Sequence, residues 1–480
     1  MNRIYHVRAA LLEDGWAPDV RITVGADGHI TRIEPRASSI EPRAAAAGLG
    51  GTDPMVETVE GYVVPGMPNG HSHAFQRGMA GNTEYRLSAR DSFWTWRQAM
   101  YALANRIAPA DLEAIAAQLF VEMLKAGYTA VAEFHYLHRA PGGAPYADSN
   151  ELWDAVTRAA ERAGIALTFL PTLYQTSDFG AQPLKPEQAR FAMSTEEFLR
   201  AVETRVAMER ASTSGLRRTG VAFHSLRAVP LSSLREAVRG LRSIDPEMPV
   251  HIHIAEQVKE VEASVGHTGR RPIELLLDAG VVDRRWCLVH ATHATPAELE
   301  GIAASSAAVC VSISTEANLG DGFFDAARFL SVGGRLCVGS DSQATVCPAE
   351  ELRWMEYQAR LRKKRRGVLA DRNESHVGTR LWREAARTGA SALGQPAGVI
   401  AEGRRADWLT LDPAHPTLAG ASADTALDHL LFAGGSAAIR DVMVGGRWVV
   451  KGRRHLAEDA LAAEFRTTIQ RLKHPPAIQT

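Results

Sequence analysis

Several features that mark other classes of protein are scarce or missing in this sequence. It has four cysteines in 480 residues, none of them in a C-x-x-C pair, which is typical of a reduced protein without a disulfide framework. The formal net charge is −1, so nothing in the composition indicates a nucleic acid or an anionic membrane as a partner. No apolar run approaches the roughly 20 residues of a membrane span, and the N-terminal residues lack a basic-then-apolar signal pattern. We therefore expect a cytoplasmic protein.

The middle of the chain has a clear repeating pattern. From about residue 100 to residue 395, helical stretches alternate with short apolar runs. Repeated βα units favour an α/β fold with a parallel sheet, and eight of them favour a closed (β/α)₈ barrel of the TIM type, whose active site lies at the carboxyl ends of the strands. The eight expected strands are residues 62–64, 129–134, 165–170, 220–223, 249–254, 286–289, 308–312 and 335–339.

The two ends of the chain have β character instead. Residues 20–24 and 29–33 alternate around an Asp-Gly turn, and residues 439–444 and 447–451 flank a Gly-Gly pair. Both patterns predict hairpins. We expect a small β-sandwich domain formed by residues 1–64 together with 396–480, with the barrel, residues 65–395, inserted between its two parts.

Two histidines separated by one residue follow the first expected barrel strand. Side chains at positions i and i+2 of an extended segment point the same way. His71 and His73 can therefore direct two imidazoles toward one divalent metal ion. An H-x-H pair alone is weak evidence, because two surface histidines give the same pattern, so the interpretation depends on the other strand ends.

Three more strand ends carry side chains that can bind metal or transfer protons. In the fifth strand, apolar residues alternate with histidines that face the barrel interior. We assign His253, nearer the carboxyl end, to the metal, and we interpret His251, one layer deeper, as a core histidine. Glu256, three residues further on, is placed for proton transfer. His290 follows the sixth strand and Asp341 follows the eighth.

Together these positions predict a mononuclear metal site. Its ligands would be His71, His73, His253 and Asp341, with water in the open position. Ligands of this kind suit Zn²⁺ best, with Fe²⁺ or Mn²⁺ as the alternatives. The expected fourth strand end, residues 223–227, offers no lysine. A lysine there could be carbamylated to bridge a second metal, so its absence favours one metal per subunit.

This pattern resembles the amidohydrolase superfamily, in particular its mononuclear aminohydrolase branch. The resemblance spans nearly the whole chain and includes residues 390–394 and 398–407, where such chains typically leave the barrel. It implies that the four ligands named above bind zinc. It also implies that a hydroxide held by the metal attacks the substrate, with Glu256, His290 and Asp341 transferring protons around it.

Five further motifs occur at residues 71–77, 93–97, 133–138, 224–227 and 315–322. They resemble one family within this branch, the N-formimino-L-glutamate (formimidoylglutamate) deiminases. The resemblance implies hydrolysis of the linear amidine N-formimino-L-glutamate to N-formyl-L-glutamate and ammonia in histidine degradation, by a homodimer. A substrate with two carboxylates suits two arginines, because guanidinium binds carboxylate bidentately. The resemblance assigns substrate binding to Gln76, Arg97, Tyr136, His224 and Arg227.

Three other interpretations stay open at this point. A related aminohydrolase acting on a heterocycle such as guanine would need stacking surfaces and amide donors more than paired arginines. A metal-binding scaffold without catalysis would be favoured by the loss of Glu256 or His290, and both are present. An oxidoreductase or nucleotide binder has little support, because no G-x-G-x-x-G follows an expected strand.

Overall fold

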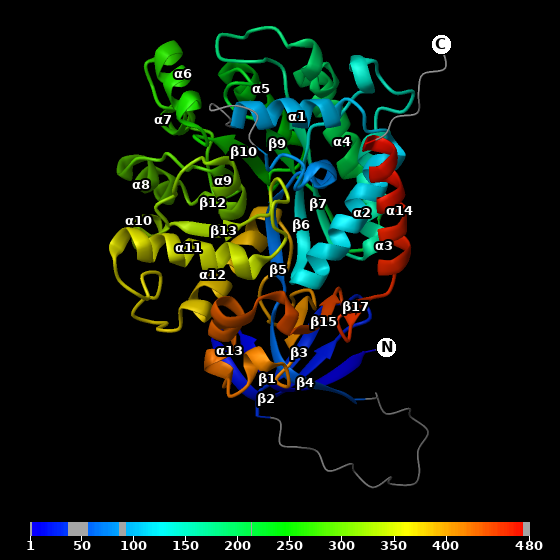
Figure 1. Cartoon of the computed structure of the whole chain (residues 1–480), viewed down its shortest axis with the longest axis vertical. Helices are drawn as coiled ribbons and strands as arrows, with labels where there is room; N and C mark the ends of the chain where they lie inside the picture. Colours follow the sequence, from blue (N-terminus) through cyan, green and yellow to red (C-terminus); the bar gives the residue numbers. More distant parts are fainter. Residues whose placement is uncertain (1, 37–55, 86–92, 213, 474–480) are drawn as a thin grey trace.

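The computed structural model describes residues 2–36, 56–85, 93–212 and 214–473. These residues form a parallel sheet surrounded by helices and a smaller, mostly antiparallel sheet at one end (Figure 1). The parallel sheet confirms the predicted barrel. Its strands, in hydrogen-bonded order, are β5 (Met67–Ser72), β6 (Tyr128–His135), β7 (Ala166–Leu173), β9 (Val221–Phe223), β10 (Val250–Ile254), β11 (Trp286–His290), β12 (Ala308–Val311) and β13 (Arg335–Val338).

The first and last barrel strands meet at their carboxyl ends. The backbone N–H groups of Ser340 and Asp341 both donate to the carbonyl of His71, at 3.0 Å, and the N–H of His73 donates to the carbonyl of Asp341 at 3.1 Å. Gly339 permits this approach, because a Cβ at that position would lie 2.7 Å from the His71 carbonyl oxygen. The closure therefore brings the first and eighth strand ends together at the predicted metal ligands.

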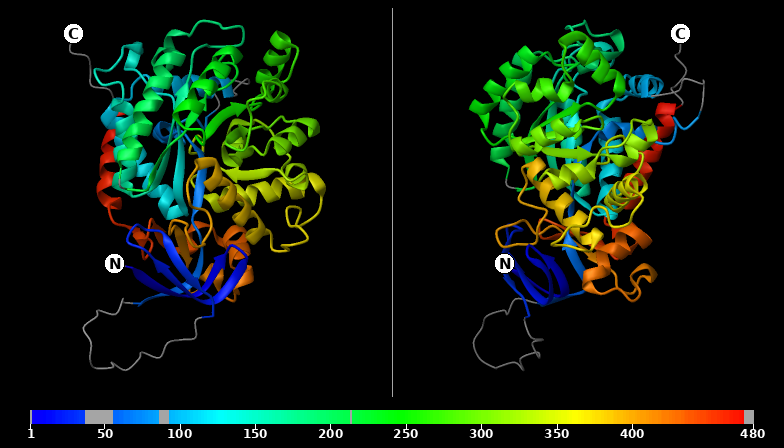
Figure 2. Two further views of the ribbon diagram at one scale, coloured as in Figure 1. Left: turned by 180° about the vertical axis from the view of Figure 1, so that it is seen from behind. Right: turned by 90° about the vertical axis from the view of Figure 1, so that its left-hand side faces the viewer.

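Helices cover the outside of the barrel in all three ribbon views (Figures 1 and 2). Most of them follow a barrel strand, as the repeated βα pattern predicted. They are α1 (Phe93–Ala104), α2 (Pro109–Ala126), α3 (Glu151–Ala163), α4 (Thr195–Ala211), α5 (Leu231–Ile244), α6 (Val258–Thr268), α7 (Pro272–Asp278), α8 (Pro296–Ser305), α9 (Ile313–Leu319), α10 (Ala326–Ser331), α11 (Pro348–Lys363) and α12 (Val377–Leu393).

The antiparallel sheet combines both ends of the chain, as predicted. Its order is β17 (Arg454–His455), β16 (Arg447–Lys451), β15 (Ile439–Val444), β14 (Trp408–Leu411), β4 (Val56–Pro65), β1 (Arg3–Leu12), β2 (Gly15–Val24) and β3 (Ile30–Glu34). The β2–β3 and β15–β16 hairpins match the two expected from the sequence. Side chains from both chain ends share one core, in which Tyr5 packs edge-on against Trp408 at 5.3 Å between ring centroids.

One predicted barrel strand was wrong. Residues 62–64 belong to β4, which pairs with β1 and β14 in the antiparallel sheet. The first barrel strand is instead β5, which begins after Gly66 and itself contains His71. The sequence pattern missed β5 because it contains Pro68, Asn69 and Gly70 and few apolar residues, whereas the apolar run before it has the stronger strand pattern. We propose the chain divisions at residues 64/65 and 395/396 as the domain boundaries.

The last helices tie the two sheets together. After β14 the chain forms α13 (Ala423–His429), whose Asp428 contacts His376 at the start of α12. After β17, α14 (Glu458–Lys473) runs back along the outside of the barrel beside α2 (Figures 1 and 2). Glu458 accepts from Lys125 of α2 at 2.6 Å. The C-terminal segment therefore fastens the small sheet to the barrel wall.

Candidate active site

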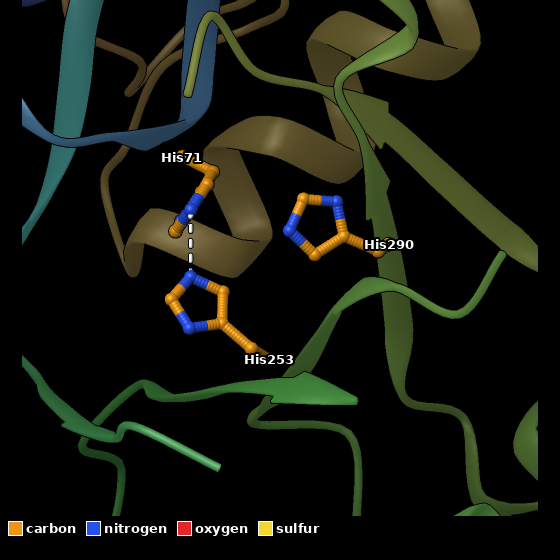
Figure 3. A group of neighbouring side chains, drawn as sticks. All are labelled: His71, His253 and His290. Atoms are coloured by element: carbon orange, nitrogen blue, oxygen red, sulfur yellow. Dashed lines mark hydrogen bonds between the residues drawn. The ribbon is translucent and has the colours of Figure 1, made fainter. Parts of the chain in front are cut away.

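Three imidazoles converge at the carboxyl ends of the barrel strands. His71 comes from β5, His73 follows β5 directly, and His253 comes from β10. The Nε2 atom of His253 lies 3.0 Å from Nε2 of His71 and 3.2 Å from Nε2 of His73. Figure 3 shows the rings of His71, His253 and His290 directed toward one another from separate strands. The i, i+2 argument from the sequence is consistent with this geometry, since His71 and His73 both reach the same point.

The other ring nitrogens fix the tautomers of two of these histidines. Nδ1 of His73 lies 2.8 Å from the carbonyl oxygen of Phe134, and Nδ1 of His253 lies 2.9 Å from that of His224. A carbonyl only accepts, so each Nδ1 carries the hydrogen and each Nε2 presents a bare lone pair. Two lone pairs only 3.2 Å apart cannot hydrogen-bond to each other, and a shared cation would satisfy both.

A carboxylate completes this donor set. Oδ1 of Asp341 lies 3.3 Å from Nε2 of His71 and 3.5 Å from Nε2 of His73. Burial lowers the pKa of His71 to about 3 and lowers the pKa values of His73 and His253 as well, so the imidazoles are neutral, which is the form that binds metal. Neutral imidazoles with an anionic carboxylate fit a divalent ion, and the cluster could bind a metal.

Glu256 and His290 lie beside this cluster. Nε2 of His290 is 3.8 Å from Oε1 of Glu256 and 3.8 Å from Oδ2 of Asp341. Burial raises the pKa of Glu256, while the nearby His290 opposes that shift. Burial alone would lower the pKa of His290, but Glu256, Glu316 and Asp341 together raise it to about 10. The arrangement places a carboxyl group with a raised pKa and a cationic imidazole next to the cluster of His71, His73, His253 and Asp341.

The backbone at these strand ends is unusual. Ala255, His290, Ala291 and Asp341 all have positive φ, at 51°, 70°, 50° and 44°. Non-glycine residues rarely adopt this region, and such strain clusters at functional sites. Here it turns the chain sharply at the ends of β10, β11 and β13, so that the side chains of Glu256, His290 and Asp341 face the barrel axis.

A pocket opens above the cluster, and the five residues assigned to substrate binding all line it. Its walls also include Glu256, His290 and Asp341, so the structure brings the two predicted sets together in one cavity. Nε2 of Gln76 donates to the hydroxyl of Tyr136 at 3.0 Å. The other substrate-assigned residues on its walls are Arg97, His224 and Arg227.

The two arginines reach the pocket from different elements. Arg97 comes from α1, and Arg227 comes from the turn that follows β9. Neither guanidinium forms an ion pair with a carboxylate of the described residues, and Nε of Arg227 is buried without a partner among them. Nε of Arg97 donates to the hydroxyl of Tyr101. Two cations therefore face one cavity, and neither has an ion-pair partner in the part of the chain that the structure describes.

The sequence reasoning gave no role to several residues that support this site. Glu316 accepts from Nδ1 of His290 at 3.3 Å, and Glu133 accepts from Ser72 Oγ at 2.8 Å, which braces the segment between the first two histidines. Tyr101 supports Arg97. Glu133 and Glu316 lie in sequence motifs that were recognised, but nothing in their spacing indicated which histidine or serine they contact. His251 lies buried in the barrel core, and its Nε2 donates to the carbonyl oxygen of Ala392 at 2.9 Å.

Comparisons with known proteins give a consistent result. Residues 62–449 match the amidohydrolase family, and residues 2–47 match the N-terminal domain of formimidoylglutamate deiminase HutF. The chain is 48% identical to formimidoylglutamate deiminase from Pseudomonas aeruginosa over 466 residues, which is 97% of this chain and 98% of that protein. Within the described residues, no helix is long and apolar enough to cross a membrane.

Solved structures agree with the fold. An amidohydrolase from Brucella melitensis superposes with a TM-score of 0.88 and 41% identity, covering 98% of this chain and 100% of that one. An adenosine deaminase from Xanthomonas campestris with bound zinc superposes with a TM-score of 0.80 and 21% identity, covering 98% of each chain. The chain belongs to the amidohydrolase family of hydrolytic enzymes and, within it, to the formimidoylglutamate deiminases.

Proposed function

We propose that this enzyme hydrolyses N-formimino-L-glutamate to N-formyl-L-glutamate and ammonia, as a step of histidine degradation. The formimino carbon gains the oxygen of water and loses its terminal nitrogen as ammonia. The 48% identity to the deiminase from Pseudomonas aeruginosa supports this reaction over nearly the full length of both chains. The substrate is a linear amidine with two carboxylates.

The observation that carries the proposal is the pair of arginines in one pocket. Arg97 and Arg227 have no carboxylate partner among the residues described, and both line the cavity that contains Glu256 and Asp341. A buried guanidinium without an anion is costly, so the pocket favours a ligand that brings its own negative charges. Two carboxylates on the substrate would supply one for each arginine, in bidentate contact.

The chain's own residues would divide the chemistry as follows. The metal would be held by His71, His73, His253 and Asp341. When bound, it would lower the pKa of a water molecule and polarise the amidine carbon. Asp341 and His290 would orient the attacking water. Asp341 would take up its proton, with the cationic His290 beside it. Glu256, whose pKa is raised by burial, carries a proton to the nitrogen that leaves as ammonia. Gln76, Tyr136 and His224 hold the amidine against this group.

Three further parts of the proposal rest on the family resemblance. We propose Zn²⁺ as the native metal, at one per subunit, since three neutral imidazoles and one carboxylate suit it. We also propose a homodimer located in the cytoplasm. Metal analysis of the purified protein and its mass by light scattering would test the first two parts, and fractionation of the native cells would test the third.

The second candidate is deamination of a heterocycle such as guanine. Aromatic side chains do surround the pocket, among them Tyr136, Tyr174 and Phe191, and they could stack on a flat ring. The two arginines argue against it, because a neutral heterocycle would bring no anion to the buried Arg227 or to the half-buried Arg97, and neither has an ion-pair partner among the described residues.

The test is ammonia release by the zinc-loaded protein with N-formimino-L-glutamate and guanine side by side, with N-formyl-L-glutamate identified as product. Turnover of the first alone would support the proposal. Turnover of guanine alone would retain the metal site and remove the carboxylate-binding role of Arg97 and Arg227.

A Glu256→Gln variant should lose about 10²- to 10⁴-fold in kcat while keeping its metal; wild-type kcat in that variant would remove Glu256 from the mechanism.

A further inference from the structure

A buried carboxylate stands behind His290, on the side of the ring away from the pocket. Glu316 comes from α9, which follows β12, and it is fully buried. Its Oε1 lies 3.3 Å from Nδ1 of His290 and accepts the backbone N–H of Ser312 at 3.2 Å. The opposite ring nitrogen, Nε2, faces Glu256 and Asp341 at 3.8 Å each. His290 is thus held between one carboxylate behind it and two in front.

This contact fixes which nitrogen of His290 faces the reacting groups. A carboxylate is an acceptor, so the Nδ1 atom beside Glu316 carries a hydrogen, and Nε2 is directed toward the pocket. The ring also stacks on His253, at 5.5 Å between centroids and 24° between planes, and meets His71 edge-on at 6.0 Å. Stacking of this kind does not distinguish one ring orientation from its flipped form, whereas the hydrogen bond to Glu316 does.

The second oxygen of Glu316 indicates that stability alone does not explain the residue. Oε2 is buried and has no hydrogen-bond partner in the part of the chain that the structure describes. Leaving a buried carboxylate oxygen unpaired costs free energy, which an apolar residue of similar size would avoid. Glu351 offers the contrast, because both of its buried oxygens have partners, namely the backbone N–H of Ser314 at 3.1 Å and the hydroxyl of Thr345 at 3.3 Å.

We propose that Glu316 is a positioning residue that acts through His290. It holds the ring so that Nε2 points at Glu256 and Asp341, and it leaves substrate binding to other residues. This inference rests on the role of His290 in the proposed function. It predicts that loss of Glu316 lowers kcat, leaves KM nearly unchanged, and has no effect once His290 itself is absent.

The experiment compares Glu316→Leu, Glu316→Gln and the control Glu351→Gln by ammonia release from N-formimino-L-glutamate. We expect Glu316→Leu to lower kcat about 10- to 100-fold, the range for partners that orient a site histidine, with KM within about threefold of wild type. Glu316→Gln keeps an acceptor oxygen beside Ser312 N–H and should recover about tenfold relative to the leucine variant. Glu351→Gln should stay within about twofold of wild type, because Glu351 does not touch His290.

Two further measurements keep the test decisive. In a His290→Ala background, Glu316→Gln should change kcat less than twofold, because Glu316 then has no imidazole ring to position. Additive losses in kcat would show that Glu316 does not act through His290. A crystal structure of Glu316→Gln or Glu316→Leu gives a readout that needs no turnover, since the expected result in the leucine variant is a His290 ring rotated away from Glu256. An unmoved ring or wild-type kcat in Glu316→Leu would overturn the inference. Absence of turnover by the wild-type enzyme would instead overturn the proposed function, and the ring position would still decide the role of Glu316.

Discussion

The two sides of the pocket are built from different parts of the fold. The metal side consists of buried residues at the ends of β5, β10, β11 and β13, whose positions are fixed by the hydrogen bonds of one sheet. The carboxylate side uses Arg97 from a helix outside the sheet and Arg227 from a turn. In the proposed function, the barrel would therefore fix the reacting groups, and the surrounding helices and loops would select the substrate. Substitutions on the two sides should have different kinetic signatures.

The largest effect is expected from removing a metal ligand. His253→Ala should abolish metal binding and lower kcat/KM by about 10³-fold or more, because several kcal/mol of transition-state stabilisation depend on the metal. His251→Gln is the matched control, two residues earlier on the same strand with its Nε2 beside the carbonyl of Ala392, and it should keep the metal. Elemental analysis and steady-state kinetics measure both. A metal-replete, active His253→Ala protein would contradict the ligand assignment.

The same comparison explains what the sequence could predict. Strand-end residues such as His253 and Asp341 were identified because each follows an apolar run, and parallel strands all end on one face. Glu316 could not be assigned to His290, since its contact depends on how α9 folds back after β12. Tyr101 was missed for a different reason, because α1, on which it lies, is not part of the repeating βα pattern. The prediction of the first barrel strand was wrong, because the stronger apolar run at residues 62–64 belongs to the other sheet.

The next effect concerns the carboxylate side. Arg227→Met should raise KM about 10²-fold with a much smaller change in kcat, because truncating one partner of a buried charge pair costs about 2–4 kcal/mol. N-formiminoglycine, which has one carboxylate, sharpens the test. One of the two arginine variants, Arg97→Met or Arg227→Met, should lose little further activity on it, because that arginine has no carboxylate left to bind. An equal loss on both substrates by both variants would contradict a clamp on two carboxylates.

A smaller effect should come from the support of Arg97. Tyr101→Phe removes the hydroxyl that accepts from Nε of Arg97 and from Nε2 of Gln188 at 3.1 Å. Of these two hydrogen bonds, the one from Arg97 bears on the pocket. Its loss is worth about 1 kcal/mol, so KM should rise about fivefold while kcat changes little. Tyr128→Phe is the control, since the Tyr128 hydroxyl is buried with no partner among the described residues. A fall in kcat without a change in KM would show that Tyr101 supports the metal side of the pocket and not the carboxylate side.

The smallest effect lies outside both sides of the pocket, where α12 meets α13. Nδ1 of His376 lies 2.6 Å from Oδ2 of Asp428, whose other oxygen accepts the Gly378 N–H at 2.7 Å. The hydrogen bond to Asp428 raises the pKa of His376 in the folded state. The protonated ring therefore stabilises the fold fully below the unfolded pKa of about 6.5, and this stability is lost as pH rises through the higher folded pKa.

Because the His376 side chain is 37% exposed, solvent screening keeps this contribution below about 1 kcal/mol. His376→Gln should lower Tm at pH 6 by no more than about 2 °C and by less at pH 9, which thermal unfolding at the two pH values would measure. Its kcat/KM should equal that of the wild type, because the contact joins scaffold elements and touches neither the metal side nor the arginines. A lower kcat/KM at full folding would show that the small domain acts on the pocket, and the site could no longer be divided into two independent sides.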